Sequence, residues 1–531
     1  MSITPESLPH DVVALRAMIL RIELEKSALR SANLSLRSKT QELETENARL
    51  HQELKYFLSQ KYGRKADVVH PGQGRLFDEA EKSADGASSE IAEDVLTVPL
   101  HIKSRGKRRP LSPLLERQVI LHDLSDNEKH CSNPDCKGCA LKEIGYTKSE
   151  QLDIIPMKMI VLEHQRKKYA CPSCESNVVT AAMPQQPIPK SIASPGLLAH
   201  TVVSKYGDAL PLYRQEAILG RLGIDLPRST TSRWMIEVGK LVEPLINKIS
   251  QKILEGPVIH SDETPIQVLN ESGKSVGSKS YMWVMARGSP GTKAVIFQYH
   301  SSRSQIVPKS LFADYRGYLQ ADGYSGYDPI TKDESPIRRI GCWAHVRRKF
   351  VDALKSAPRG GEGTVANGAV RLIKELYEIE REVKDMDSDG RYRVRQDRAL
   401  PKLLEIRVWL DKRLSEVLPK SMTGKALSYM DNEWEYLSRY VESGELSIDN
   451  NLAERAIRPF AIGRKNWMFS DTTHGAKASA ALYSLMETAK ANDVEPYAYL
   501  KHVFTEIPKA GSDEVIAALL PWEYKRNILR Q

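Results

Sequence analysis

Long apolar runs are missing from this sequence of 531 residues. No stretch reaches the ~18 uninterrupted apolar residues that a helix needs to cross a bilayer, which excludes a membrane-spanning protein. The first residues, MSITPESLPHDVV, lack the basic start and apolar core of a secretory signal, so we expect a soluble, cytoplasmic chain. Hydrophobic residues make up 41%, below the roughly 45–50% of an average globular protein but enough for sizeable cores. A wholly disordered chain is therefore excluded as well.

Acidic residues are fewer than basic ones, and the basic excess is concentrated in two places. Lys and Arg number 77 against 68 Asp and Glu, a net charge of +9. Residues 103–109 carry five basic residues and no acid, and residues 338–355 carry six against one, so each stretch has +5 and the remainder has 9 − 10 = −1. Such clusters favour an acidic partner such as nucleic acid. We expect neutralisation of 338–355 to weaken DNA binding and to flatten its salt dependence.

A seven-residue apolar repeat runs through the N-terminal region. Its members are Leu15, Ile22, Leu29, Leu36, Leu43, Leu50 and Phe57. A sustained heptad keeps one seam facing a partner helix, so we predict a coiled coil over residues 11–60 that pairs protomers into a homodimer or a higher oligomer. The companion core position is unusually polar, with Asn33 and Asn47, which is typical of a fixed two-stranded register. The alternative is one amphipathic helix packed on its own chain.

Residues 61–125 show no sustained periodicity and contain PGQG and SADGASSE, so we predict a linker. Its basic run KSRGKRR forms an arm whose candidate DNA contacts are Arg105, Arg108 and Arg109. A DNA-binding arm and a merely solvated charge run are supported about equally.

Cysteine is scarce but clustered, because five of the six cysteines lie between residues 131 and 174. Two C-x-x-C pairs, Cys136 with Cys139 and Cys171 with Cys174, suit four thiolate ligands around a tetrahedral zinc ion. Disulfides are disfavoured in a reducing cytosol. We therefore predict a structural zinc module over 126–180, with Cys131 as a substitute candidate for one ligand. The sixth cysteine, Cys342, is most simply a small core residue.

Residues 190–250 have a helical pattern. YRQEAILGRL predicts one helix, GIDLPR a turn, and TTSRWMIEVGKL a second helix capped by Ser229. This is the outline of a helix-turn-helix, in which the start of the second helix meets base edges. Thr230, Thr231 and Arg233 are the candidate contacts, although two helices joined by a turn are also common in ordinary cores.

Acidic residues end two predicted strands after residue 256. GPVIHSDETPIQVL places Asp262 at one strand end, and GYLQADGYSGYD places Asp322 at another. Glu454 lies downstream on a helix that Asp449 or Asn450 should cap. Three such carboxylates could hold two Mg²⁺ ions, which prefer oxygen ligands. The alternative is ordinary turn chemistry at the two Asp residues and a helix ion pair between Glu454 and Arg458.

The basic stretch 338–355 lies between the second and third candidate acids. Trp343 and His345 are interleaved with its arginines, which suits phosphate neutralisation and base stacking, although Trp343 could equally be core and His345 a structural histidine. Apolar stripes then follow, and they predict an all-helical insertion at about 356–445. They comprise Leu372, Leu376, Ile379 and Val383, and then Leu403, Ile406, Leu410, Leu414 and Val417.

The ordered motifs together resemble the IS-sixty-six family of insertion-sequence transposases, large subunits of the DDE type. The likeness covers nearly the whole chain, through YGRK, SEQLDIIP, EHQRKKYACPSC, PLYRQEAI, HSDETPIQVL, LQADGYSGY, GCWAHVRRKF, DNNLAERAIRPFAIGRKNWMF, ALYSLMETAKANDVEPYAYL and LLPWEY. It implies a ribonuclease-H-like catalytic domain with Asp262, Asp322 and Glu454 as the catalytic, Mg²⁺-binding acids, Mn²⁺ being an alternative. Glu263 is the rival for the first position. CSNPDCKGC departs from the family by offering three sulfurs where one C-x-x-C is usual.

The resulting prediction is a multidomain α+β protein. It comprises the coiled coil, the zinc-binding module, the helical DNA-binding region, an α/β ribonuclease-H-like domain over 256–480 with its helical insertion, and a family-specific tail over 481–531. The resemblance implies a bacterial, nucleoid-associated transposase that binds terminal inverted repeats and target DNA, cleaves and joins strands, and acts with small accessory proteins of the same element. Alternatives are an inactive DNA-binding repressor and a structure-specific nuclease. Candidate DNA contacts in the catalytic region are Trp343, His345, Arg347, Arg348, Arg458, Arg464 and Lys465.

Overall fold

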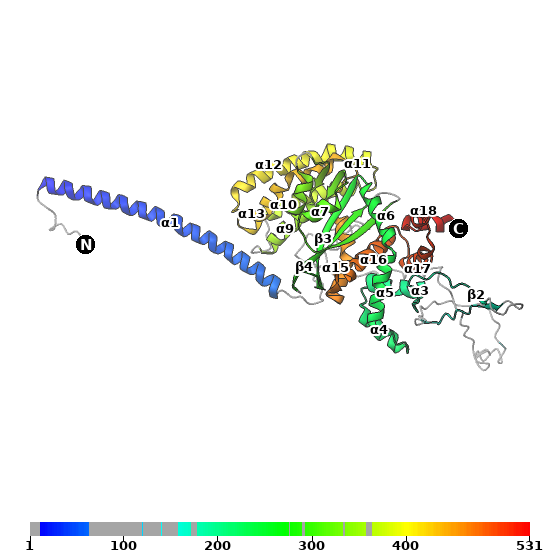
Figure 1. Ribbon diagram of the computed structural model, residues 1–531. Coiled ribbons are helices and arrows are strands. Elements are labelled where there is room, and N and C mark those ends of the chain that lie inside the picture. The colour runs from blue at the N-terminus through cyan, green and yellow to red at the C-terminus, as the bar shows by residue number, and fades with distance from the viewer. Residues whose placement is uncertain are drawn as a thin grey trace. The chain divides into compact units, whose positions relative to one another are not determined.

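The computed structural model describes residues 11–62, 119, 140, 158–170, 178–275, 277–288, 292–332, 335–356 and 364–530 (Figure 1). The chain forms two compact units, one of residues 88–183 and one of the remainder. Within the smaller unit, β1 (Lys168–Ala170) pairs antiparallel with β2 (Val178–Thr180). The predicted zinc ligands and the basic arm lie outside the described residues: Cys131, Cys136, Cys139, Cys171 and Cys174, with Arg105, Arg108 and Arg109.

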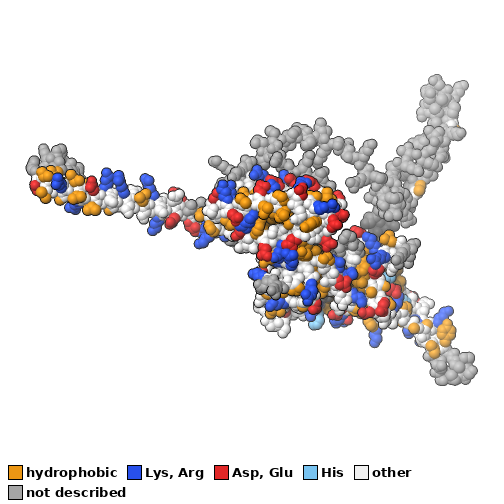
Figure 2. All heavy atoms as spheres, turned by 90° about the horizontal axis from the view of Figure 1, so that it is seen from above, with side chains coloured by type: hydrophobic (Ala, Val, Ile, Leu, Met, Phe, Trp, Pro, Cys, Tyr) orange, Lys and Arg blue, Asp and Glu red, His pale blue; other side chains and the backbone are white. Residues whose placement is uncertain are grey.

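The larger unit begins with one long helix, α1 (Val12–Tyr62). Large hydrophobic side chains of the heptad are exposed along it, including Leu29 at 68%, Leu36 at 65% and Leu43 at 64% (Figure 2). Hydrophobic side chains are normally buried when a helix packs on its own domain, so the described part of the chain does not cover this seam. A partner helix for α1 therefore stays a prediction.

The predicted helix-turn-helix is formed by α4 (Leu212–Arg221) and α5 (Arg228–Leu241), which follow α3 (Pro195–Val202) and a π-helical segment, Val203–Gly207. The predicted cap is wrong, because α5 starts at residue 228 and its N-cap is Pro227 rather than Ser229. Pro227 contributes its carbonyl oxygen, which accepts from the amides of Thr230 and Thr231. Helix α6 (Glu243–Leu254) then leads into the sheet.

The central sheet is mixed. Strands β3 (Val258–Asn270), β4 (Lys279–Arg287) and β5 (Ala294–His300) are antiparallel, whereas β6 (Gly317–Gln320) and β7 (Ile337–Ile340) add parallel to β3. The order is β5-β4-β3-β6-β7, and β8 (Ser470–Thr472) pairs with the far end of β3. Two short helices, α7 (Ile306–Leu311) and α8 (Asp328–Thr331), with a 3₁₀ turn at Ser325–Tyr327, connect the later strands.

The first candidate acid is in the middle of a strand rather than at its end. The sequence predicted a break at the acids, but β3 continues through them, and its pairing with β4 runs from His260 to Gln267. Asp262 lies opposite Val284 in this register. The reason is tertiary, because the long antiparallel partner β4 compensates for the low strand propensity of the acidic residues.

A helical region separates β7 from the third candidate acid. It follows α9 (Trp343–Ser356) and comprises α10 (Val365–Glu382), α11 (Ser388–Val394), a π-helical segment at Arg395–Ala399, α12 (Leu400–Glu416), α13 (Met422–Asn432), α14 (Trp434–Ser438) and a 3₁₀ turn at Arg439–Glu442. Most of the two predicted stripes is buried in its core, although Leu414 and Val417 are only partly covered. These helices group together in Figure 1.

The chain then forms α15 (Asn451–Trp467), α16 (Thr473–Ala491), α17 (Pro496–Glu506), a 3₁₀ turn at Ile507–Lys509, α18 (Asp513–Ala518) and α19 (Pro521–Arg530). Helix α16 protects the edge strand β5, because Ser484 Oγ accepts from the amide of Phe297 at 2.7 Å and Thr488 Oγ1 from that of Val295 at 3.1 Å. The boundary expected between 480 and 481 falls inside this helix. Among the described residues, no helix is both long and apolar enough to cross a membrane.

Candidate active site

Asp262 and Asp322 are placed side by side by the parallel pairing of β3 and β6. His260 pairs with Gln320 in this register. Asp262 comes two residues after His260, and Asp322 comes two residues after Gln320, so the two Asp residues lie at matching positions on neighbouring strands. Asp322 comes just after β6 ends, as the sequence predicted. Its Oδ1 accepts from the amide of Tyr324 at 3.1 Å, and its backbone carbonyl accepts from Arg339 Nη1 at 2.8 Å. These bonds fix the loop that carries the second acid.

Glu454 comes from the first turn of α15 and faces the start of α9. Its Oε2 accepts from Arg348 Nη2 at 3.2 Å, and its Oε1 lies 3.5 Å from His345 Nδ1. Two predicted DNA contacts, His345 and Arg348, are therefore neighbours of a candidate catalytic acid.

The charges of the other two candidate acids act on Asp262. Burial raises the pKa of Asp262 well above its usual value, and neighbouring negative charges act in the same direction: Glu263, Asp322 and Glu454. Like charges raise the pKa of a carboxyl only when they lie close, so the sheet and α15 do bring the predicted acids into one region. A region of this kind attracts a cation, and carboxylate oxygens are the donors that Mg²⁺ prefers.

Glu263, the rival for the first position, is already engaged. Its Oε1 accepts from Arg303 Nε at 2.6 Å, and its Oε2 accepts from the hydroxyl of Tyr327 at 3.2 Å. The Arg303 guanidinium stacks on Tyr324, with its carbon 3.9 Å from the ring centroid. A carboxylate held by a charged pair and a tyrosine is less free to bind a metal, which favours Asp262 as the ligand.

Asn450, an almost completely buried residue before α15, ties α15 to β3 and to the residue that precedes α9. Its Nδ2 donates to the carbonyl of Ser261 at 2.8 Å, its Oδ1 lies 3.1 Å from His260 Nδ1, and its amide donates to Cys342 Sγ at 3.2 Å. It is the N-cap residue of α15 by position, without a side-chain capping bond. The adjacent Asp449 accepts instead from the amide of Asn451 at 3.2 Å. Asn450 therefore fixes α15 relative to β3.

Two predicted DNA contacts need correction because their side chains are buried. Trp343 is 0% exposed, and its indole donates to the carbonyl of Leu437 at 2.9 Å, so no ring face is open to a base. Thr231 is 3% exposed, and its hydroxyl donates to Arg228. Helix periodicity does not predict these burials, because they result from packing on distant elements.

The remaining predicted DNA contacts differ in how far their side chains are exposed. Arg233 and Lys465 are exposed, and Thr230, Arg347 and Arg458 are half-buried. Arg464 is engaged with β3, donating to Thr264 Oγ1 at 3.0 Å and to the carbonyl of Pro265. The exposed cations are better placed than the half-buried ones to contact DNA phosphates.

The basic stretch 338–355 does not act as one surface. Arg339 is 2% exposed, donates to Glu433 Oε1 at 3.0 Å, and stacks on Tyr436. Arg339 supports the Asp322 loop from the interior, so it is not one of the cations of this stretch that face solvent.

Sequence reasoning missed Arg303, Tyr327 and the supporting role of Asn450. Arg303 is a single basic residue in HSSRSQ, and nothing in the local pattern distinguishes it from a solvated side chain. Asn450 shares a helix face with Glu454, which was the available signal. Its bond to Ser261 joins residues that are 189 positions apart in the sequence, so a local sequence pattern does not predict it.

Known proteins match this chain across its length. The family model described as "Transposase IS66 family" matches residues 190–478, "IS66 C-terminal element" matches 484–522, and "zinc-finger binding domain of transposase IS66" matches 128–175. The uncharacterized protein y4qI of Sinorhizobium fredii (strain NBRC 101917 / NGR234) is 31% identical over 98% of both chains. The uncharacterized protein y4jD of the same strain is 31% identical over 82% of this chain and 89% of its own. No solved structure matches. The chain belongs to the IS66 family of transposases.

Proposed function

We propose that this protein binds the ends of an insertion sequence, cleaves the DNA in a metal-dependent reaction and joins the freed 3′ ends to target DNA. The proposal is supported above all by the parallel β3–β6 pairing, which puts Asp262 and Asp322 on neighbouring strands, and by the charge of Glu454, which acts on Asp262 from α15. The mixed sheet also supports it, since an antiparallel β5-β4-β3 half joined to a parallel β3-β6-β7 half agrees with the ribonuclease-H-like fold that the sequence led us to expect.

The three acids fit divalent cations of the Mg²⁺ type. All three donors are carboxylates, they are half-buried, and burial and mutual repulsion raise the pKa of Asp262, which a bound cation would relieve. Asp262, Asp322 and Glu454 would hold two Mg²⁺ ions or Mn²⁺, which when bound polarise the scissile phosphate and stabilise the leaving oxygen.

Residues of the chain itself prepare this site. Arg348 holds one oxygen of Glu454, and Asn450 fixes α15 against β3, so the third acid keeps its position relative to the first two. Arg303 neutralises Glu263, which would otherwise add a further negative charge beside the phosphate. Exposed cations such as Arg233 and Lys465 are available to contact DNA backbone phosphates.

The other modules would supply DNA recognition. The match to the family's zinc-finger domain supports structural zinc, for which Cys136, Cys139, Cys171 and Cys174 are the proposed ligands, with Cys131 as a substitute. Helix α5 would present its exposed N-terminal residues to DNA, and the basic arm at 103–109 would follow the phosphates. Accessory proteins of the same element are further proposed partners.

Helix α1 would pair two protomers through its exposed heptad seam. Replacing Leu36 with glutamate removes one apolar side chain per chain from that seam, each worth about 1.5–3 kcal/mol on burial. We therefore expect the dissociation constant of the dimer to rise by more than roughly 100-fold. The measurement is molar mass by light scattering across a dilution series.

Leu24→Glu is the matched control for this experiment. Leu24 is 72% exposed on the same helix but lies outside the heptad seam, so its replacement should leave the mass unchanged. Equal masses for wild type and Leu36→Glu at every concentration would show that α1 does not pair protomers.

Labelled element ends incubated with the purified protein and Mg²⁺ test the function itself. The proposal requires both cleaved and joined products. Binding without any cleavage would indicate an inactive, transposase-derived repressor, and cleavage without joining would indicate a structure-specific nuclease.

A further inference from the structure

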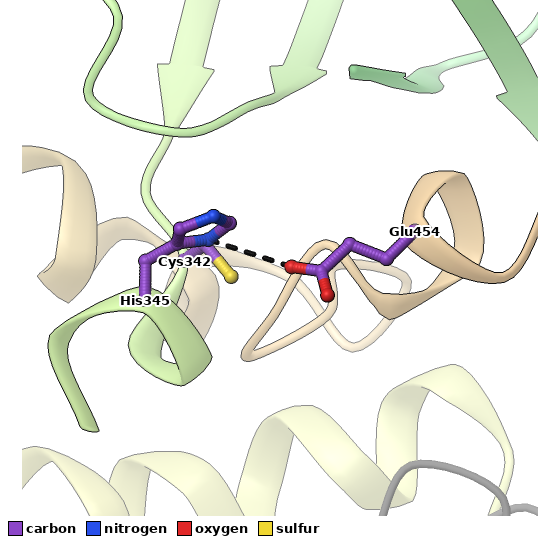
Figure 3. Close-up of side chains that lie close together, drawn as sticks. All are labelled: Cys342, His345 and Glu454. Carbon is purple, nitrogen blue, oxygen red and sulfur yellow. Dashed lines mark ion pairs between the residues drawn. The ribbon is translucent and has the colours of Figure 1, made fainter. Parts of the chain in front are cut away.

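Cys342, His345 and Glu454 form a compact group of donor atoms (Figure 3). One donor atom of each, the thiol sulfur, a ring nitrogen and a carboxylate oxygen, lies within 4.8 Å of the other two. The group combines sulfur, nitrogen and oxygen donors, whereas the neighbouring acids Asp262 and Asp322 offer oxygen alone. Its chemistry is therefore different from that of the carboxylate set.

The backbone holds these side chains in place from two elements. Cys342 immediately precedes α9, and its carbonyl accepts from the amide of His345 at 3.2 Å, so both side chains emerge from one helix start. The amide of Trp343 donates to the carbonyl of Ile448 at 3.2 Å, and the amide of Asn450 donates to Cys342 Sγ. The start of α9 is thereby fastened to the segment that leads into α15, which carries Glu454.

Two atoms of the group are buried and lack a hydrogen bond. Within the described part of the chain, His345 Nδ1 and Glu454 Oε1 have no hydrogen-bond partner, although they face each other at 3.5 Å. Buried polar atoms in folded proteins nearly always have a partner. A cation between the two atoms would satisfy both, and the sulfur of Cys342 would supply a third bond.

We propose that Cys342, His345 and Glu454 form a binding site for a thiophilic divalent cation, with Zn²⁺ as the ion that the donors fit best. Thiolate and imidazole select Zn²⁺ over Mg²⁺, and three protein ligands leave a fourth position for water. The ligand is the thiolate, so binding releases the thiol proton of Cys342 to solvent. This site is separate from the zinc module, whose candidate ligands all lie between residues 131 and 174.

Occupancy of this site has a consequence for the acid set. Because Arg348 already holds Oε2 of Glu454, Oε1 is the oxygen that both Zn²⁺ beside His345 and Mg²⁺ beside Asp262 would draw on, so the two metals compete for it. Low concentrations of Zn²⁺ should therefore inhibit Mg²⁺-supported strand transfer. This consequence rests on the proposed function, whereas binding of the cation does not.

Cobalt titration of the full-length protein tests the binding. Co²⁺ reports tetrahedral sulfur-containing sites through a thiolate-to-cobalt band in the near ultraviolet and through visible bands. Wild type should bind one Co²⁺ more than Cys342→Ser and should show the additional thiolate band. The variant keeps a hydrogen-bond acceptor for Asn450, and any exchange of cobalt into the zinc module contributes equally to both proteins.

Two further variants make the comparison decisive. His345→Gln should weaken binding of the additional ion by at least roughly 10-fold. If Cys342→Ser does not fold, the comparison of wild type with His345→Gln tests the site in its place. Asp322→Asn should keep the additional band, because Asp322 belongs to the oxygen set. Identical spectra and stoichiometry for wild type, Cys342→Ser and His345→Gln would overturn the site, even if all of these proteins transpose DNA.

Inhibition is measured separately, as the Zn²⁺ concentration that halves strand transfer at fixed Mg²⁺, relative to the zinc-free rate of each protein. Cys342→Ser should require at least roughly 10-fold more Zn²⁺ than wild type. Equal sensitivity would overturn the competition for Glu454. If no protein joins strands, the proposed function fails while the cobalt result still decides the site.

Discussion

Replacing Asp322 with asparagine is expected to reduce the rate of strand transfer by more than roughly 100-fold. Changes to groups that only support a metal ligand typically reduce activity by about 10- to 100-fold, and the loss of a ligand itself should exceed that. Asparagine keeps the acceptor for the amide of Tyr324, so the loop should retain its conformation. It loses the negative charge that a divalent cation requires. Joined products from labelled element ends measure the effect, and DNA binding should persist because Asp322 carries no positive charge.

Asp328→Asn is the matched control for Asp322→Asn. Asp328 lies six residues further on and pairs with Lys332 at 2.9 Å, and its charge is not among the causes that raise the pKa of Asp262. Its replacement should leave strand transfer within a few-fold of wild type. Comparable joining by Asp322→Asn and wild type would exclude Asp322 as a catalytic ligand and would remove the main support for the proposed chemistry.

Replacing Arg395 with methionine is expected to destabilise the helical region by about 3–5 kcal/mol, the cost of removing one partner from a buried ion pair. Arg395 is 1% exposed, and its Nη2 lies 2.6 Å from Glu380 Oε2. It also donates to three backbone carbonyls, those of Tyr440, Ser443 and Leu446. Methionine fills a similar volume but leaves these groups without a donor. Thermal unfolding followed by circular dichroism measures the loss.

Arg398→Met provides a control on the same pair of helical segments. Arg398 forms an ion pair with Glu382, but both side chains are about half exposed, at 46% and 55%. Water therefore replaces the pair, and no shift in the unfolding temperature is expected.

Arg395→Met should also impair strand transfer, because the carbonyls that Arg395 binds precede α15 and Glu454. Equal unfolding temperatures for Arg395→Met and Arg398→Met would contradict the proposed role of Arg395.

Much of the local structure could be predicted from the sequence. The turn between α4 and α5 contains Gly223 and Pro227, which end and start helices, and it lies where the sequence predicted it. The apolar stripes of α10 and α12 are largely buried, because helix periodicity alone decides which face is apolar. Asp322 lies just beyond β6, since Asp322 and Gly323 are poor strand formers and the strand ends before them.

Features that depend on distant partners were not predicted. The strand through Asp262 continues because β4 pairs with it, and Trp343 is core because Leu437 and Trp434, from the helical region, pack against its ring. Arg339 appeared to be part of a basic surface, yet it is buried against Glu433, 94 residues away. Local sequence reports neither the partner nor the burial.

The sequence by itself determined the family, the three candidate acids and the elements that carry them, because motifs and periodicity are local properties of the chain. Only the tertiary structure decided how these residues are used. It fixed the helix of Glu454 against the strand of Asp262 through Asn450, paired Glu263 with Arg303, and gathered Cys342 and His345 beside Glu454. Each of these contacts joins residues far apart in sequence, and the packing of the sheet against α9 and α15 sets which of them meet.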